Sequence, residues 1–266
     1  SVIRVICVIF VHSYKNPRSC SLRFYRAVRD LKPVWMLEDM RTMETFYSEE
    51  DARQRNFTPS EALLYAIVHD HREYARFLLS RHTEEALARP GERVCCCPPS
   101  HLTTAVRYDR RYILGLILQE SHRMPSSLQH EPGQVSPGGG RQDPLHLACE
   151  LLRPEAVVLL LGNGASPARA GPDRLDPAGR RRRQCLDNLL MFMPKVHFKL
   201  KAALGREPGR WGKVLGEETY EYLAGRSPAP LFLCAMQTVL QQLSPATFPD
   251  SLHGLPIPSS LKPRLV

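Results

Sequence analysis

Cysteine and histidine side chains are the first candidates for chemistry in this chain, because they bind metals and act as nucleophiles or bases. Three cysteines are adjacent at Cys95–Cys97, and one residue separates His69 from His71. This spacing fits no common zinc pattern, and adjacent cysteines cannot bridge one another without severe strain. We therefore predict no metal site, and we expect the eight scattered cysteines to be the reduced thiols of a cytosolic protein.

Other catalytic arrangements are missing from the sequence. No nucleophile, base and orienting group stand at a recognisable spacing, and the glycine run at 138–140 lacks the lysine and the flanking strand of a phosphate-binding loop. We predict that the chain is not an enzyme and binds no cofactor.

The charge of the chain raises the possibility of an anionic partner. The formal net charge is +9, and four arginines form one run, Arg180–Arg183, beside a Pro/Gly-rich stretch. A basic loop of this kind is more often solvated than a binding groove, so we predict no nucleic-acid partner. A nuclear or nucleic-acid-linked protein that uses Arg180–Arg183 stays open as an alternative.

The first 18 residues are an uncertain segment that we leave out of the fold prediction. They contain an apolar run of about ten residues, too short to cross a bilayer, with no charged stretch before it and no clear cleavage site. No other segment is long and apolar enough to span a membrane. We expect a cytoplasmic protein without a membrane partner.

The clearest pattern of secondary structure in the sequence lies at residues 143–167, DPLHLACELLRPEAVVLLLGNGASP. The spacing of apolar residues predicts two short helices, around 147–151 and 155–161, with a break at Arg153–Pro154 and closing glycines. The stretch resembles an ankyrin repeat, whose TPLHxA and LLLxxGA patterns it matches except for Asp143 in place of threonine. The signature residues, to which we assign a structural role, are Leu145, His146, Ala148 and Gly164. By this resemblance the ring of His146 hydrogen-bonds to backbone between repeats.

Fainter copies of the repeat lie upstream. Residues 62–79 align with 101–118, which places Ala66, Ala105 and Ala148 in register, at steps of 39 and 43 residues. An ordinary ankyrin unit has about 33 residues, and the excess falls in loops, where added length is tolerated. Residues 24–40 resemble the repeat of residues 62–79 more weakly, at a step of forty residues, with Tyr25, Val28 and Asp30 aligned to Tyr65, Val68 and Asp70. We predict that they form an N-terminal capping unit rather than a full repeat.

These patterns predict an all-α protein, a short ankyrin-repeat solenoid with irregular long loops and a C-terminal helical segment. After the uncertain residues 1–18, we expect degenerate repeats over 19–170 and a basic Pro/Gly loop over 171–183. A helical closing segment over 184–226 and a separate C-terminal segment over 227–266 complete the predicted layout.

The C-terminal segment contains a helix that is apolar on more than one face. Leu231, Ala235 and Val239 lie four residues apart on one side, and a second apolar set, Leu233, Met236, Leu240 and Leu243, lines another. A helix that is apolar nearly all round should be buried nearly all round. Only about two dozen residues follow it, so we expect one face to rest on the solenoid and the other to bind a partner.

Two motifs in this segment resemble the two halves of a SOCS box. Pro230-Leu231, followed at four-residue steps by Ala235 and Val239, is similar to the elongin-binding BC box, with Ala235 in the position of the usual cysteine. The later stretch LPIPSSLKPRL is similar to the cullin box, in the LPxP form associated with cullin-5 rather than cullin-2.

Over residues 20–266 the chain resembles ankyrin-repeat proteins with a SOCS-box-like C-terminus. That resemblance implies a non-catalytic substrate receptor of a cullin-5 RING E3 ubiquitin ligase, with elongin B/C and cullin-5 with its RING subunit as partners. Inosine monophosphate dehydrogenase is the implied target for ubiquitination and proteasomal degradation. The alternative is an ankyrin interaction scaffold without a ligase. The implied elongin-binding residues are Leu231, Ala235, Met236 and Val239, and the implied cullin-binding residues are Leu255, Pro256, Ile257 and Pro258.

Overall fold

The structure is a computed structural model that describes residues 22–43, 46–48, 53–88, 100–124, 143–167, 180–193, 204–206 and 208–263. These residues form two compact units, which we call unit 1 (described residues up to 124) and unit 2 (described residues from 143). The clearest repeat therefore belongs to unit 2. The uncertain residues 1–18, the Cys95–Cys97 run, the glycine run at 138–140 and the loop residues 171–179 lie outside the described residues.

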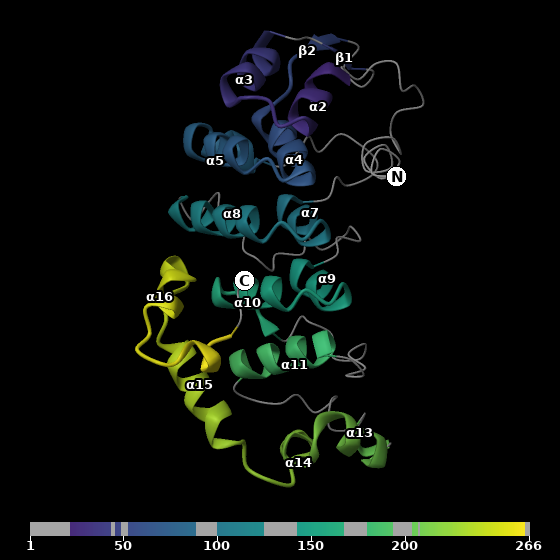
Figure 1. The fold of residues 1–266 in the computed structure, drawn as a ribbon, viewed down its shortest axis with the longest axis vertical. Coiled ribbons are helices and arrows are strands. Elements are labelled where there is room, and N and C mark those ends of the chain that lie inside the picture. The colour runs from purple at the N-terminus through teal and green to yellow at the C-terminus, as the bar shows by residue number, and fades with distance from the viewer. Residues whose placement is uncertain are drawn as a thin grey trace. The chain divides into compact units, whose positions relative to one another are not determined.

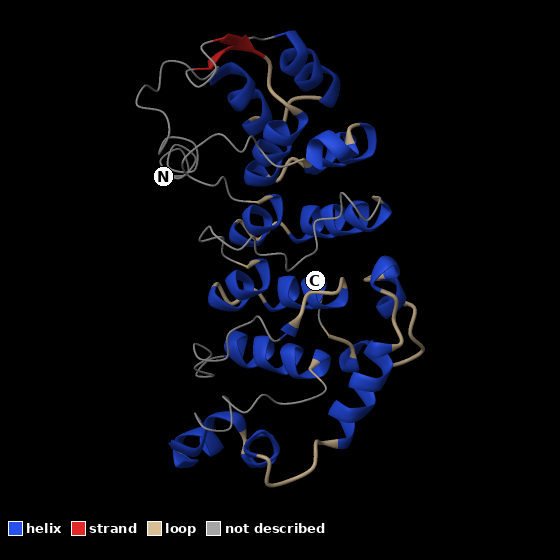
Figure 2. Ribbon diagram, turned by 180° about the vertical axis from the view of Figure 1, so that it is seen from behind, coloured by secondary structure: helices blue, strands red, loops and turns tan. Residues whose placement is uncertain are grey.

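Helices make up nearly all regular structure in the described residues, as Figure 2 shows, and the predicted all-α ankyrin-repeat class is confirmed. The sequence did not predict the one small antiparallel strand pair in the described part of unit 1, in which Tyr47 lies opposite Gln54. The elements of unit 1 are α2 Leu22–Arg29, α3 Val34–Met43, β1 Phe46–Ser48, β2 Arg53–Arg55, α4 Pro59–His69, α5 Arg72–Arg81, α6 Thr83–Leu87, α7 His101–Arg107 and α8 Arg111–Arg123.

Unit 1 is built from stacked helix pairs. Helices α4 and α5 form one layer and α7 and α8 the next, with α4 against α7 and α5 against α8 (Figure 1). Each pair buries its apolar face only because the neighbouring pair covers it, as in other repeat proteins. The largest fully buried side chains of this core are Phe24, Leu37, Leu63, Leu64, Ile67, Tyr74, Leu78, Leu79, Ile113, Leu114 and Ile117.

Polar residues that cap the helix ends fix where the repeat helices begin. Thr58 forms a capping box with Glu61 at the start of α4, and the Ser100 hydroxyl accepts from the backbone N–H of Thr103 at the start of α7. In the clearest repeat the Asp143 carboxylate accepts from the backbone N–H groups of the next turn. Each cap satisfies donors that a helix start leaves free.

A left-handed residue ends the first helix of every repeat. The N–H of this residue donates to the carbonyl three positions back, and the next N–H donates to the carbonyl five positions back, which is the Schellman arrangement. The four residues are Leu31, Asp70, Asp109 and Leu152, with φ between 52° and 56°.

These turns establish the repeat register. They lie 39 and 43 residues apart from Asp70 onward, so the predicted alignment of Ala66, Ala105 and Ala148 is confirmed. The predicted step of forty for the first unit is wrong by one, because Leu31 rather than Asp30 has the left-handed conformation. The true match of Ala66 in that unit is Ala27, which is likewise buried.

Unit 2 begins with the clearest repeat and continues into the C-terminal helices. Helix α10 packs against α9 and α11, α15 packs against α11, and α13 packs against α14. Figure 1 shows α15 running alongside α11, with α16 beyond it. The elements are α9 Pro144–Glu150, α10 Pro154–Gly162, α11 Arg180–Phe192, α13 Pro208–Leu215, α14 Glu217–Ala224, α15 Leu231–Gln241, η3 Pro245–Thr247, α16 Asp250–His253 and η4 Ser259–Leu261.

The arginine run departs from the predicted layout, because Arg180–Arg183 form the first turn of α11 rather than the end of a loop. Arginine favours helices, and Arg183 is further held by an ion pair of 2.8 Å with Asp187 one turn later. The same guanidinium donates to the carbonyl of Leu215 and to the hydroxyl of Thr219. Arg183 therefore ties α11 to α13 and α14, which gives one of the four arginines a role in the fold.

Candidate protein interface

Helix α15 has a buried face that faces the rest of unit 2. Leu233, Met236 and Leu240 are at most 9% exposed on this face. Between them lies Gln237, whose side-chain amide donates to the carbonyls of Leu190 and Met193 at 2.8 and 2.9 Å. These two carbonyls belong to the C-terminal end of α11, where helices leave acceptors free. The buried face thus fixes both the position and the rotation of α15.

The opposite face of α15 is apolar and exposed. Leu231 is 86% exposed and Phe232 is 45% exposed, values that are high for large apolar side chains on a folded domain. Ala235 lies on the same exposed strip one turn after Leu231, and Val239 is half-buried a turn later. Leu231, Ala235 and Val239 are the residues that the sequence placed together on one apolar side of this helix. With Phe232 they form what we call the exposed strip.

Met236 is the exception among the residues assigned to the partner-facing set. Its side chain is only 4% exposed and belongs to the buried face with Leu233 and Leu240. A residue one position after Ala235 is rotated about 100° around the helix axis, which carries it from the exposed strip into the core. The assignment of Met236 to a partner contact is therefore corrected.

Phe248 anchors the residues that follow α15. It is 1% exposed, and a Cβ added at Gly162 would lie 2.3 Å from its ring. Phe192 meets the same ring edge-on, with 6.5 Å between centroids. The ring therefore occupies space that only a glycine at the end of α10 leaves open, and it fastens the C-terminal segment to the helices of unit 2.

The predicted cullin-binding stretch alternates between buried and exposed positions. Leu255 and Ile257 are half-buried, whereas Pro256 and Pro258 are exposed. The Lys262 ammonium donates to the carbonyl of His253 at 2.7 Å, which folds the chain back onto α16. The stretch thus presents its two prolines outward, and Leu261 beyond them is 44% exposed. The final residues 264–266, which complete the motif, lie outside the described residues.

Three of the ankyrin signature residues lie in α9, and the fourth follows α10. Leu145 and Ala148 are fully buried, and Gly164 has φ 94° in the left-handed turn that ends α10. His146 is half-buried, and its backbone N–H donates to the Asp143 carboxylate at 3.4 Å. The predicted hydrogen bond of its ring stays a prediction.

Metal-ligand clusters and cysteine thiols are the groups in the described part of the chain whose chemistry the structure can assess. No group of three or more His, Cys, Asp and Glu side chains there could hold a metal ion. Burial raises the pKa of the Cys149 and Cys185 thiols to about 12. Thiols with such pKa values stay protonated at neutral pH and are poor nucleophiles. Cys234 on α15 differs, because it is exposed.

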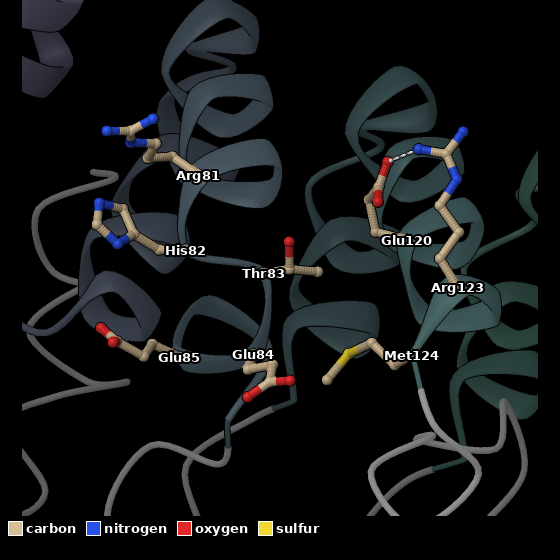
Figure 3. A pocket seen from close by; sticks show the side chains of 8 residues that line it. All are labelled: Arg81, His82, Thr83, Glu84, Glu85, Glu120, Arg123 and Met124. Carbon is tan, nitrogen blue, oxygen red and sulfur yellow. Dashed lines mark hydrogen bonds and ion pairs between the residues drawn. The ribbon is translucent and has the colours of Figure 1, made fainter.

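A charged groove of about 430 Å³ lies in unit 1 at the ends of α5, α6 and α8 (Figure 3). Its walls carry both signs of charge, and Arg123 pairs with Glu120 at 2.7 Å. Small-molecule sites are mostly apolar with a few convergent polar groups, so this groove does not resemble one. Its lining residues are Arg81, His82, Thr83, Glu84, Glu85, Glu120, Arg123 and Met124.

Sequence reasoning missed the residues that position the exposed strip. Gln237 interrupts the apolar side of α15, and a polar residue at such a place is a signal that a buried hydrogen bond is needed. Phe248 stands alone among small and proline residues, and nothing in the sequence links it to Gly162, 86 residues earlier.

Among the described helices, none is long and apolar enough to cross a membrane.

Comparison with known proteins places the chain in a family. No protein-family model and no solved structure matches it. A curated mouse protein, ankyrin repeat domain-containing protein 9, is 38% identical to it over 295 aligned positions, which cover 94% of this chain and 90% of the relative. This likeness supports a protein-interaction role based on the repeats. The chain therefore belongs to the ankyrin repeat domain-containing protein 9 family.

Proposed function

We propose that this chain is the substrate receptor of a cullin-5 RING E3 ubiquitin ligase. In this proposal the exposed strip of α15 binds elongin C of the elongin B/C pair, and the stretch Leu255–Pro258 contacts cullin-5. The repeats hold a protein substrate, with inosine monophosphate dehydrogenase as the candidate target. The chain performs no chemistry itself. It raises the effective concentration of a substrate lysine near the ubiquitin-charged enzyme.

The exposure of Leu231 is the observation that carries the proposal. A leucine that is 86% exposed on a well-anchored helix gains about 1.5–3 kcal/mol when a partner buries it. Ala235 and Val239 extend the apolar contact along the same face of α15. The buried face and the Gln237 hydrogen bonds hold the strip in place before a partner arrives, so little ordering is needed on binding.

The deciding experiment compares binding of purified elongin B/C to the intact chain and to Leu231→Asp. We expect the affinity to fall at least about tenfold, because the aspartate would enter an apolar contact without a partner for its charge. Met43→Asp is the matched control, since Met43 is 78% exposed in unit 1 and its replacement should leave binding unchanged. Equal binding by the intact chain and Leu231→Asp, or no binding by either, would contradict the proposal.

Two further readings locate the contacts. Bound elongin should protect the exposed Cys234 from alkylation, because this thiol lies beside the strip. Pro256→Ala should weaken capture of cullin-5 while leaving elongin binding intact, since Pro256 is exposed and distant in sequence from α15. Loss of elongin binding in Pro256→Ala would show that the two contacts are not separate.

An ankyrin scaffold without a ligase is the second candidate, and Ala235 favours it. The BC box that α15 resembles has a cysteine where this chain has an alanine, and Cys234 is rotated about 100° away from that position. The scaffold predicts that deleting residues 227–266 leaves substrate binding and substrate lifetime in cells unchanged. The receptor predicts that substrate binding persists while degradation stops.

A further inference from the structure

The turns between the paired helices of unit 1 form one continuous surface, which we call the turn edge: residues 26–33, 68–72 and 107–111. Hydrogen bonds join each turn to the next. The His71 ring donates through Nε2 to the carbonyl of Lys32 at 2.9 Å, while its Nδ1 accepts from the backbone N–H of Tyr74. Arg110 donates to the carbonyls of Ile67 and Val68 at 3.2 and 2.9 Å.

The carboxylates of the turn edge are all neutralised by neighbouring arginines. Each of the three turns carries one aspartate, and each aspartate forms an ion pair with an arginine of the same turn, at distances between 2.7 and 3.7 Å. The pairs are Asp30 with Arg29, Asp70 with Arg72, and Asp109 with Arg111.

Further cations on the turn edge have no such partner within the part of the chain that the structure describes. Arg26, Lys32 and Arg107 are exposed, and their side chains make no hydrogen bond or ion pair with another described residue. Arg110 uses its N–H groups on two carbonyls and forms no ion pair with a carboxylate among the described residues. The turn edge therefore has a positive excess that its own aspartates do not cancel.

Two buried polar groups, on His69 and Tyr108, lie within the turn edge, and the pKa of His69 responds to its positive charges. The Nε2 atom of His69 and the hydroxyl of Tyr108 are both buried without a hydrogen-bond partner in the described part of the chain. The pKa of His69 is lowered to about 4, first by burial and then by the positive charges of Arg29 and Arg110. Its ring rests edge-on against Tyr25, 4.9 Å between centroids.

We propose that the turn edge is a docking surface for an acidic segment of a protein partner, with separate carboxylates that pair with Arg26, Lys32 and Arg107. The alternation of aspartates and free cations favours a peptide over a nucleic acid. A continuous phosphate backbone would meet Asp30, Asp70 and Asp109 along the same row, whereas an acidic peptide can place its charges between them.

This inference deepens the proposed function and depends on it in one respect: a ligase receptor would use the turn edge to hold an acidic segment of its substrate. Binding of the segment itself requires no ligase subunit. Failure at the turn edge would therefore leave the elongin contact untouched, and failure of the elongin contact would leave the turn edge untouched.

Fluorescence anisotropy with a labelled peptide of twelve alternating glutamate and serine residues tests the proposal on the full chain. The same peptide with glutamine in place of glutamate should bind at least about tenfold more weakly, and binding of the acidic peptide should fall as salt rises. Bound peptide should also raise the pKa of His69, followed by the NMR signal of its ring. Equal binding of the two peptides would overturn the proposal.

A pair of matched variants assigns the binding to the turn edge. Arg26→Glu with Arg107→Glu reverses two free cations in the last turns of α2 and α7. Arg81→Glu with Arg123→Glu makes the same change in charge in the last turns of α5 and α8, away from the turn edge. We expect the first pair to weaken peptide binding at least about tenfold and the second less than about threefold. Equal losses, or tighter binding of a uridine 12-mer or of phosphatidylserine vesicles than of the peptide, would overturn the proposal.

Discussion

The turn edge of unit 1 and the exposed strip of α15 in unit 2, the two surfaces that we propose bind partners, have opposite chemistry. The turn edge carries arginines and lysine around neutralised aspartates, whereas the strip is led by Leu231 and has no charge. Contacts between exposed charges weaken with salt, and apolar contacts do not. If both proposals hold, binding at the turn edge should weaken as salt rises, whereas binding at the strip should not.

The two surfaces also differ in how the fold holds them. Each turn of the turn edge is bonded to the next by side chains such as His71 and Arg110, so its rigidity is spread over several repeats. The strip depends on one helix, which rests on Gln237 and on the apolar residues around it. Damage to a single anchor should therefore affect the strip far more than the turn edge.

Phe248→Ala should destabilise unit 2, which holds the exposed strip, and leave the turn edge of unit 1 unaffected. Removal of a phenylalanine that is 1% exposed leaves a cavity between the C-terminal segment and Gly162, at a cost of about 3–5 kcal/mol in the free energy of unfolding of unit 2. Urea unfolding followed by circular dichroism measures the loss. Phe232→Ala is the matched control, because Phe232 is 45% exposed and should lose less than about 1 kcal/mol.

Gly162, which faces the Phe248 ring, allows a more specific test of this contact. Gly162→Ala places a methyl group against the Phe248 ring and should itself destabilise unit 2 by about 1–3 kcal/mol. Combined with Phe248→Leu, the alanine should cost less than it does alone. Additive losses in the double variant would show that Gly162 and Phe248 do not share one contact. Neither change should alter binding of the acidic peptide to the turn edge.

His69 tests the positive environment of the turn edge through pH. Its pKa is about 4 in the folded chain and near 6.5 in an unfolded one, so between these values the unfolded chain binds more protons. Stability from the neutral ring is complete above about pH 6.5 and is lost as the pH falls toward 4. We expect a loss of about 1–2 kcal/mol by pH 4.5, after allowance for the partial exposure of the ring.

His69→Phe keeps a ring against Tyr25 but removes the titration. The variant should lose less stability than the wild-type chain between pH 7.5 and 4.5, measured as the midpoint of urea unfolding at each pH. Carboxylates titrate alike in both proteins, so the difference between the two curves isolates His69. Parallel curves would mean that the histidine is not held neutral by its surroundings.

Much of this fold follows from local sequence signals. The two helices of residues 143–167 and the closing glycine depend on neighbours within one or two turns, and the sequence predicted them, although the first helix begins at Pro144 rather than near residue 147. The alignment of Ala66, Ala105 and Ala148 was equally accessible, because small buried residues recur where helices pack closely. The exposed apolar face of α15 could be predicted as well, from apolar residues that lie on more than one side of the helix.

The remaining features depend on contacts that are distant in sequence. The spacing of apolar residues already placed Met236 and Ala235 on different sides of α15, but the sequence does not say which side is buried. That is set by the contact with α11, which buries the side of Met236. Arg183 looked like part of a basic loop because its partners Leu215 and Thr219 lie more than thirty residues away. The turn edge has no motif at all, since its charges come together only when the repeats stack.

Leu31→Gly makes the smallest change and tests whether the turn edge carries local backbone strain. Leu31 has φ 52°, a conformation that costs a residue with a side chain about 1–2 kcal/mol, and it is 58% exposed. Glycine removes that cost but loses about 0.5–1 kcal/mol through the greater freedom of the unfolded chain. We therefore expect a net gain of about 0.5–1 kcal/mol in the free energy of unfolding of unit 1, measured by urea unfolding. Leu31→Ala should bring no gain, because alanine meets the same steric cost. A loss of stability in Leu31→Gly would mean that the exposed leucine makes a contact worth more than the strain, which would add an apolar element to a surface that we describe as charged.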